Sequence, residues 1–290
     1  RDVLGSRGLG DVYKRQQMDW FQGAGDQGVM IGYACDETKQ LMPMPVVLAN
    51  RIVRELSACR QSSYIQGILP DGKAQVTVEY ENGKPVRLDS VVVSCQHTED
   101  KNLKKLEAEI RKKVLLPALR LLPPDEDTKI LINPSGRFVC GGMDADTGLT
   151  GRKLMVDSYG SMVPHGGGAF SGKDCSKVDR SAAYMARYIA KNIVAAGLAS
   201  KCQVSLAYAI GVAQPVMVQV DTFGTGNVCA DDCLELAIPL VFGLTPKQIV
   251  DSLRLTRPIF RQTAAFGHFG RKEFPWERTG KVEALRNAVI

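Results

Sequence analysis

Apolar and polar side chains alternate between residues 75 and 80, with the period of two that is typical of a half-buried strand. Asn82 and Gly83 follow, and this dipeptide favours the tight turn of a β-hairpin. Residues 86–94 are again rich in β-branched side chains, which favour strands. The pattern therefore predicts a β-hairpin that turns at Asn82 and Gly83.

Apolar residues recur at helical spacing in two longer segments, which predicts two amphipathic helices. The first lies in the basic stretch at residues 101–113, and the second follows Ser176, its expected N-cap, and stops at Gly197. The apolar positions are Leu103, Leu106, Ile110 and Val114 in the first helix, and Val178, Ala182, Met185, Ile189, Ile193 and Ala196 in the second.

Shorter elements complete the pattern. Short strands are expected at residues 130–132, 138–140, 154–159, 203–211 and 216–222, and a late helix is expected to open at Thr245 and Pro246. Strands and helices that alternate and include a hairpin predict an α+β protein rather than a doubly wound parallel sheet.

The composition is that of an ordinary soluble protein. The chain has 290 residues, of which 44% are hydrophobic and 23% charged, and this length suits two domains. No apolar run approaches the roughly 18 residues that a membrane span needs. Residues 1–16 lack the apolar core of a signal peptide. We therefore expect a cytoplasmic protein that does not enter a membrane.

Eight cysteines are scattered without a paired framework, which is typical of reduced thiols in an intracellular fold. Cys229 and Cys233 resemble half of a zinc site, but no second pair or histidine cluster follows them, so we do not expect zinc. The net charge of +6 is modest for a nucleic-acid-binding protein. Because Glu107 and Glu109 interrupt the basic stretch, we interpret it as a solvated helix face and expect no nucleic-acid partner.

Residues 141–179 contain groups that suit the binding of a polyphosphate. The glycine run at residues 166–168 has no Cβ atoms, so its backbone N–H groups can approach a bulky anion closely. Arginine offers a planar fork to two phosphate oxygens, and lysine offers a point charge. Carboxylates nearby could balance these cations and bind Mg²⁺. The charged residues are Asp144, Asp146, Arg152, Lys153, Lys173, Lys177 and Asp179.

A P-loop of a nucleotide hydrolase is one interpretation of this segment. The spacing of Gly167, Gly172 and Lys173 fits the pattern G-x-x-x-x-G-K. However, Asp174 stands where the motif requires Ser or Thr to bind the metal, and that hydroxyl is half of the motif's chemistry. The P-loop is therefore the weaker hypothesis.

Five longer stretches match one family in its own order, from about residue 17 to the end of the chain. They are QGAGDQG from Gln22, INPSGRFVCGG from Ile132, GLTGRK from Gly148, HGGGAFSGKDCSKVDRSAAY from His165 and GHFGR from Gly267. Together they closely resemble methionine adenosyltransferase, the S-adenosylmethionine synthetase family. Stretches of this length are far more specific than any short pattern.

The resemblance implies the S-adenosylmethionine synthetase fold, in which intertwined α/β domains share a similar topology. It divides the chain into a foreign or mistranslated leader at residues 1–16, a central domain at 17–140 and a C-terminal domain at 141–290. The family's N-terminal domain is then expected to be largely missing. An inactive truncated fragment that only dimerises or binds nucleotide is therefore the alternative hypothesis.

The resemblance also implies the reaction. The family forms S-adenosylmethionine from ATP and L-methionine: the methionine sulfur attacks the ribose 5′ carbon, and the departing triphosphate is hydrolysed to phosphate and pyrophosphate. Mg²⁺ and K⁺ are the implied cofactors. The implied assembly is a homodimer, or a dimer of dimers that makes a homotetramer, with active sites shared between subunits.

Carried over position by position, the resemblance implies a role for each matching residue. Lys73, Arg152, Lys173 and Asp26 match the catalytic residues. The residues that match ATP contacts are Asp71, Gly72, Lys73, Arg137, Phe138, Asp146, Arg152, Lys153, Ala169 and Lys173. Asp146 and Lys177 match methionine contacts, and Asp179 matches a magnesium ligand.

Overall fold

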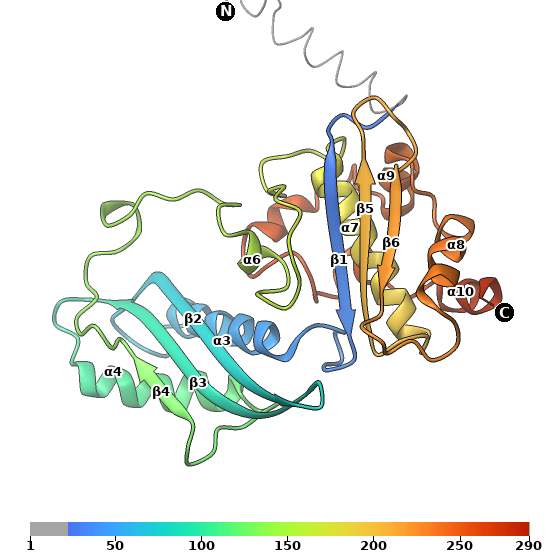
Figure 1. The fold of residues 1–290 in the computed structure, drawn as a ribbon. Coiled ribbons are helices and arrows are strands. Elements are labelled where there is room, and N and C mark those ends of the chain that lie inside the picture. Colours follow the sequence, from blue (N-terminus) through green and yellow to red (C-terminus); the bar gives the residue numbers. More distant parts are fainter. Residues whose placement is uncertain (1–22, 290) are drawn as a thin grey trace, which may run out of the picture. The chain divides into compact units, whose positions relative to one another are not determined.

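The computed structural model describes residues 23–289, which belong to two compact units. Unit 1 contains the described residues up to Met42 and from Thr150 onward, and unit 2 contains Pro43–Leu149. Each unit combines strands and helices (Figure 1), which confirms the α+β class. These units are defined by contacts between residues and not by family domains. The domain boundary expected near residue 140 therefore stays a prediction.

The sheet of unit 2 contains the predicted hairpin. β2 (Ile68–Glu81) and β3 (Lys84–His97) pair antiparallel, and β4 (Lys129–Ile132) pairs parallel with β3. Asn82 and Gly83 have φ values of 49° and 74°, and two positive φ values in a row are typical of a type I′ turn. The hairpin and its turn are therefore confirmed.

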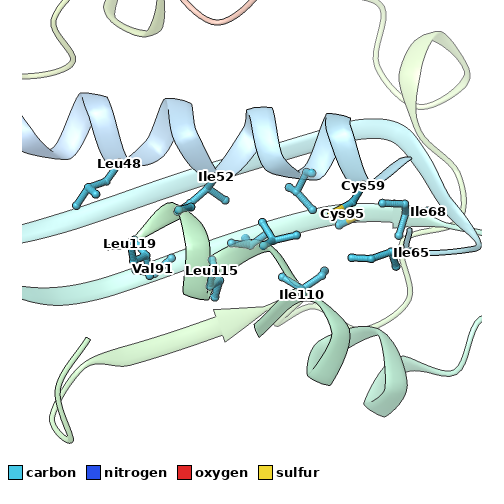
Figure 2. Close-up of a cluster of buried hydrophobic side chains, with 14 of the residues drawn as sticks. Leu48, Ile52, Cys59, Ile65, Ile68, Val91, Cys95, Ile110, Leu115 and Leu119 are labelled. Carbon is cyan, nitrogen blue, oxygen red and sulfur yellow. The ribbon is translucent and has the colours of Figure 1, made fainter. Parts of the chain in front are cut away.

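Two helical segments enclose the core of unit 2 together with the strands (Figure 2). One is α3 (Met44–Gln61), and the other runs through α4 (Leu103–Ile110), η1 (Arg111–Leu115) and α5 (Leu116–Ala118). Their apolar stripes meet alternate side chains of β3, which is why one face of that strand is buried. The core includes Leu48, Ile52, Cys59, Val91, Cys95, Ile110, Leu115 and Leu119.

The basic stretch at residues 101–113 is a helix surface above this core, as predicted. Lys101 and Lys113 both pair with Glu109, at 2.7 and 3.2 Å, so part of the positive charge is neutralised locally. The helix widens to a π-helical turn at η1, where the N–H of Leu116 donates to the carbonyl of Arg111, five residues before it. Pro117 accounts for this, because it has no N–H for the carbonyl of Lys113.

Unit 1 is built on an antiparallel sheet in the order β1, β5, β6. The strands are β1 (Gly28–Cys35), β5 (Lys201–Tyr208) and β6 (Met217–Asp221), and the last two correspond to the strands expected in this region. α7 (Val178–Ala195) lies across one face (Figure 1). A Cβ atom on Gly32 would lie 2.0 Å from the carbonyl carbon of Ala186, so glycine is required where helix and strand touch.

α7 ends as predicted but begins differently. Gly197 has a φ of 73°, and the N–H of Leu198 bonds back to the helix, as in a Schellman motif. The expected N-cap is wrong, because Lys177 occupies that position and the Ser176 hydroxyl bonds the carboxylate of Asp174 instead. The Asp174 carboxylate also accepts the backbone N–H of Ser176 at 2.7 Å, so Ser176 belongs to the turn before the helix.

Two expected short strands are absent from the described structure. α6 (Leu154–Asp157) is a single helical turn, since the N–H of Asp157 donates to the carbonyl of Lys153, four residues before it. So short a segment carries too little periodicity to distinguish the two structures. Residues 138–140 form no strand either, because the N–H of Phe138 donates to the ring of His97.

The remaining helices of unit 1 are short. They are α8 (Asp231–Val241), α9 (Pro246–Leu253) and α10 (Val282–Ala288), with the 3₁₀ turns η3 (Phe260–Ala264) and η4 (Pro275–Glu277). α9 opens as predicted, since Thr245 and Gln248 form a capping box. In the described part of the chain no single helix is long and apolar enough to span a bilayer. The pair α8 and α9, bent by 75°, meets the length and composition of a broken span.

A buried ion pair connects α7 to the rest of unit 1. Arg187 donates to Glu277 at 2.8 Å and also to the carbonyls of Tyr33, Gln40 and Leu41, and neither charged side chain is exposed to water. Burial by itself would raise the pKa of Glu277, but the positive charges of Arg187 and of Lys191, whose ammonium lies 2.7 Å from the carboxylate, together outweigh burial and lower the pKa. The carboxylate is therefore charged in the folded protein.

Replacing this carboxylate should destabilise unit 1 strongly. We expect Glu277→Gln to lower the free energy of unfolding by about 3–5 kcal/mol, because Arg187 is left buried without a counter-charge. Urea denaturation followed by the fluorescence of Trp276, in a Trp20→Phe background, measures this change close to the site. The effect should shrink as the pH falls below about 4.3, because a lowered carboxyl pKa stabilises the fold only while the group is ionised.

Glu283→Gln is the matched control for this prediction. Glu283 also pairs with an arginine, at 3.2 Å, but its side chain is 81% exposed. We expect a change below about 1 kcal/mol for the control. Equal effects of the two substitutions would contradict the structural role of the buried pair.

Candidate functional site

The glycine run of unit 1 lies directly against β1 and the first turn of α7. A Cβ atom on Gly166 would lie 1.6 Å from the carbonyl oxygen of Val29, and one on Gly168 would lie 2.4 Å from the carboxylate carbon of Asp179. Only glycine fits such close contacts. We refer to residues 165–172 as the glycine loop.

Lys173 and Asp179 form an ion pair beside this loop. The Lys173 ammonium lies 2.9 Å from the Asp179 carboxylate and also donates to the carbonyl of Ala169 at 2.8 Å. The two side chains are 28% and 16% exposed, so the pair is partly shielded from water. An ammonium has three N–H donors, which leaves one for a ligand. Asp179 is therefore the group that balances Lys173.

The segment before β1 reaches the same place. A Cβ atom on Gly25 would lie 3.8 Å from the Lys177 ammonium, and one on Gly28 would lie 3.8 Å from a carboxylate oxygen of Asp179. Asp26 lies between these two glycines and accepts a hydrogen bond from the N–H of the next residue at 2.9 Å. The structure thus brings Asp26 into the neighbourhood of Lys177 and Asp179 from a distant part of the sequence.

Arg152 and Lys153 belong to a segment that touches the glycine loop. A Cβ atom on Gly151 would lie 3.4 Å from Ser171 and 3.7 Å from Ala169, both on the loop. Arg152 and Lys153 are exposed, and within residues 23–289 neither makes an ion pair. Their positive charge is available to an anion from outside the chain.

A buried network that sequence reasoning did not identify supports the loop. Arg180 donates to the carbonyl of Lys173 at 2.7 Å, to the Tyr184 hydroxyl at 3.0 Å and to Thr263 at 2.9 Å. Tyr184 in turn bonds His268 at 2.7 Å. Burial lowers the pKa of His268 to about 3, so the ring is neutral. The stretch from Gly267 that resembles the family was the available signal, but its partners come from other segments.

The geometry around Lys173 differs from that of a P-loop. In a P-loop the lysine opens the helix that follows, whereas α7 begins only at Val178. Asp174 accepts the N–H of Ser176 at 2.7 Å within the turn between them. The P-loop interpretation is therefore not supported.

Unit 2 holds the other expected site residues. Asp71, at the beginning of β2, accepts the N–H of Gly142 at 2.9 Å, and its own N–H donates to Gln96. Gln96 also donates to the carbonyl of Val139 at 2.9 Å, so it ties the strand to the segment that follows β4. Sequence reasoning missed Gln96, because nothing in its local pattern distinguishes it. The side chain of Lys73 is exposed beside this junction.

The segment after β4 brings the remaining residues of unit 2 to the same junction. The N–H of Phe138 donates to His97 at 3.0 Å, and the Arg137 side chain donates to the carbonyl of Glu99. The N–H of Asp146 donates to the carbonyl of Gly142 at 3.0 Å, beyond the short turn η2 (Gly142–Asp144). The expected residues Asp71, Gly72, Lys73, Arg137, Phe138 and Asp146 thus belong to unit 2, and Asp26, Arg152, Lys153, Ala169, Lys173, Lys177 and Asp179 belong to unit 1.

No group of three or more histidine, cysteine or acidic side chains in the described structure is arranged to hold a metal ion. The eight cysteines are all free thiols. A divalent ion at Asp179 would therefore take most of its ligands from a bound anion and water.

Comparison with known proteins gives a consistent result along the chain. The family model for the central domain of S-adenosylmethionine synthetase matches residues 21–138, and the model for its C-terminal domain matches residues 140–278. An S-adenosylmethionine synthase of a Nocardioides species is 56% identical over 272 residues, which cover 92% of this chain and 68% of that protein. The S-adenosylmethionine synthase of Desulforudis audaxviator is 55% identical over 283 residues, which cover 97% and 70%. The chain belongs to the S-adenosylmethionine synthetase family.

Proposed function

We propose that this chain is an enzyme that forms S-adenosylmethionine from ATP and L-methionine, and that the glycine loop with its cations binds the triphosphate. The observation that carries this proposal is the Lys173–Asp179 pair, held at 2.9 Å against the glycine loop. Lys177 lies next to Gly25, three residues before the glycine that borders Asp179, and the segment of Arg152 contacts the loop. Several cations gathered around one carboxylate suit a highly charged anion.

The chemistry requires positive charge rather than a base. A lone pair of the methionine sulfur forms the new S–C bond at the ribose 5′ carbon, while the C–O bond to the triphosphate breaks and its electrons leave with oxygen. Thioether sulfur has no proton to lose, so a general base is unnecessary. Fixed cations that meet the charge of the departing triphosphate stabilise the transition state. Water then cleaves the triphosphate into phosphate and pyrophosphate.

Each expected residue has a role in this proposal. Lys173, Arg152 and Lys153 bind phosphate oxygens, and Lys177 binds the methionine carboxylate. Asp146 meets the methionine amine and ATP, and Asp26 lies near the methionine and ribose. The remaining nucleotide contacts are Asp71, Gly72, Lys73, Arg137, Phe138 and Ala169, of which Arg137 and Phe138 lie beside the adenine.

Mg²⁺ fits the donor set around Asp179. This ion is commonly held by one or two carboxylates together with substrate phosphates and water, and Asp179 provides such a carboxylate next to Lys173. When bound, Mg²⁺ neutralises charge on the leaving triphosphate. K⁺ is part of the proposal through the family resemblance, and no described residue is assigned to it.

A homodimer, or a dimer of dimers, is the assembly that we propose. The sheet face of unit 1 opposite α7 supports it. Val29, Ala207 and Met217 lie side by side in register across β1, β5 and β6 on that face. Val29 and Met217 are 40% and 36% exposed, so a row of apolar side chains is available to a second subunit.

Lys173→Met should weaken triphosphate binding. We expect the dissociation constant of inorganic triphosphate, measured by calorimetry with Mg²⁺ present, to rise about ten- to a hundredfold, because one charge-assisted hydrogen bond is lost. Lys247→Met is the matched control, since Lys247 also pairs with an aspartate, at 2.8 Å, but on the exposed surface of α9. Equal affinities of the Lys173 variant and the control would contradict the assignment.

Gly168→Ala should abolish the binding of inorganic triphosphate and leave the fold intact. The added Cβ atom would lie 2.4 Å from the Asp179 carboxylate carbon, so the carboxylate must leave its place beside Lys173. Gly280→Ala is the control, because nothing lies within 4 Å of a Cβ atom added there. We expect the loss of triphosphate binding only in the first variant, with both circular dichroism spectra unchanged.

Product analysis distinguishes the candidate activities directly. We expect the chain, incubated with ATP, L-methionine and Mg²⁺, to accumulate S-adenosylmethionine that chromatography and mass spectrometry detect. Triphosphate binding without this product would favour the alternative of an inactive fragment that binds nucleotide. Steady release of phosphate from ATP without methionine would instead favour a nucleotide hydrolase.

A further inference from the structure

His165 opens the glycine loop, and its two ring nitrogens have different surroundings. The N–H of Gly167 donates to Nδ1 at 2.9 Å. Nε2 is buried and has no hydrogen-bond partner among the described residues. In contrast, His97 and His268 have partners at both ring nitrogens. The buried nitrogen of His165 is therefore not explained by the fold alone.

The hydrogen bond from Gly167 determines where the ring of His165 carries its proton. Nδ1 accepts this bond, so it holds a lone pair, and the proton must sit on Nε2. Nε2 is then a buried N–H donor. A buried donor without an acceptor is costly, so a partner is expected beside it.

A small pocket is lined by His165. It is bounded by the glycine loop, by β1 and by α7, and both His165 and Asp179 line it. Its free volume of about 10 Å³ is close to the space that one water molecule needs. The Asp179 carboxylate can only accept hydrogen bonds, and the His165 Nε2–H can only donate. A water molecule can accept from the ring and donate to the carboxylate at the same time.

We propose that His165 is a positioning residue whose Nε2–H binds one water molecule in this pocket, and that this water donates to the Asp179 carboxylate. Lys173 holds the same carboxylate at 2.9 Å. The two contacts together fix its orientation, as partners of metal-binding carboxylates commonly do. The inference rests on the proposed function, in which Asp179 meets the cation that accompanies the triphosphate.

Two substitutions separate this role from a purely structural one. The amide oxygen of asparagine lies where Nδ1 lies in histidine, so His165→Asn keeps the acceptor for the Gly167 N–H and loses the Nε2 donor. The amide nitrogen of glutamine lies where Nε2 lies, so His165→Gln keeps the donor and loses the acceptor. If His165 only tethers the loop, the Asn variant should retain normal binding. If His165 positions Asp179, the Gln variant should retain it.

Calorimetric titration of inorganic triphosphate, with and without Mg²⁺, measures the difference. We expect His165→Asn to weaken Mg²⁺-dependent binding by about ten- to a hundredfold and to leave binding without Mg²⁺ unchanged. His165→Gln should remain close to the unsubstituted chain. In an Asp179→Asn background, His165→Asn should have no further effect. The opposite ranking of the two variants, or equal behaviour, would overturn the inference.

A high-resolution crystal structure of the unliganded chain tests the same contact without activity or metal. We expect one ordered water within hydrogen-bond distance of both His165 Nε2 and a carboxylate oxygen of Asp179. A dry pocket, or an Nε2 bonded to a protein group, would contradict the inference even if triphosphate binding is normal. If the water is present and triphosphate does not bind, the proposed function fails while the contact stands.

Discussion

The buried pair of Arg187 and Glu277 is the interaction on which the geometry of unit 1 depends. Arg187 extends from α7 and satisfies its donors on the Glu277 carboxylate and on carbonyls at and after the end of β1. A fully buried guanidinium is tolerated only when its donors are satisfied, so the pair restricts how α7 crosses the sheet. Asp179 lies about two turns earlier on the same helix. The position of the carboxylate against the glycine loop therefore follows from a contact far from the loop itself.

Around that carboxylate, close backbone packing and charge balance act together. Gly166 and Gly168 allow the loop to touch β1 and Asp179, and Lys173 neutralises the carboxylate beside them. Arg180 donates a hydrogen bond to the carbonyl of Lys173 and belongs to a network that reaches His268. The loop is thus shaped by the fold before any ligand arrives, and such preorganisation is what electrostatic stabilisation of a leaving group requires.

Local sequence patterns predicted the elements whose causes are local. The turn at Asn82 and Gly83 and the cap at Thr245 act within a few residues, so the hairpin and α9 could be predicted. The single turn of α6 was mistaken for a strand because it is too short to show a period. The pairing of β1 with β5, which assembles unit 1 from two distant stretches, leaves no local signal.

For the site, the family resemblance identified Lys173 and Asp179, which lie in one short stretch. The supporting roles of Gln96 and Arg180, and the unused nitrogen of His165, depend on tertiary packing and were visible only in the structure.

We infer that the glycine loop and the segment before α6 bind one triphosphate between them. The most direct measurement is a crystal structure of the chain with inorganic triphosphate and Mg²⁺. We expect phosphate oxygens within hydrogen-bond distance of both the Lys173 ammonium and the Arg152 guanidinium, with Asp179 as the protein ligand of Mg²⁺. Triphosphate bound elsewhere, or Lys173 and Arg152 directed to unrelated surfaces in the complex, would contradict it.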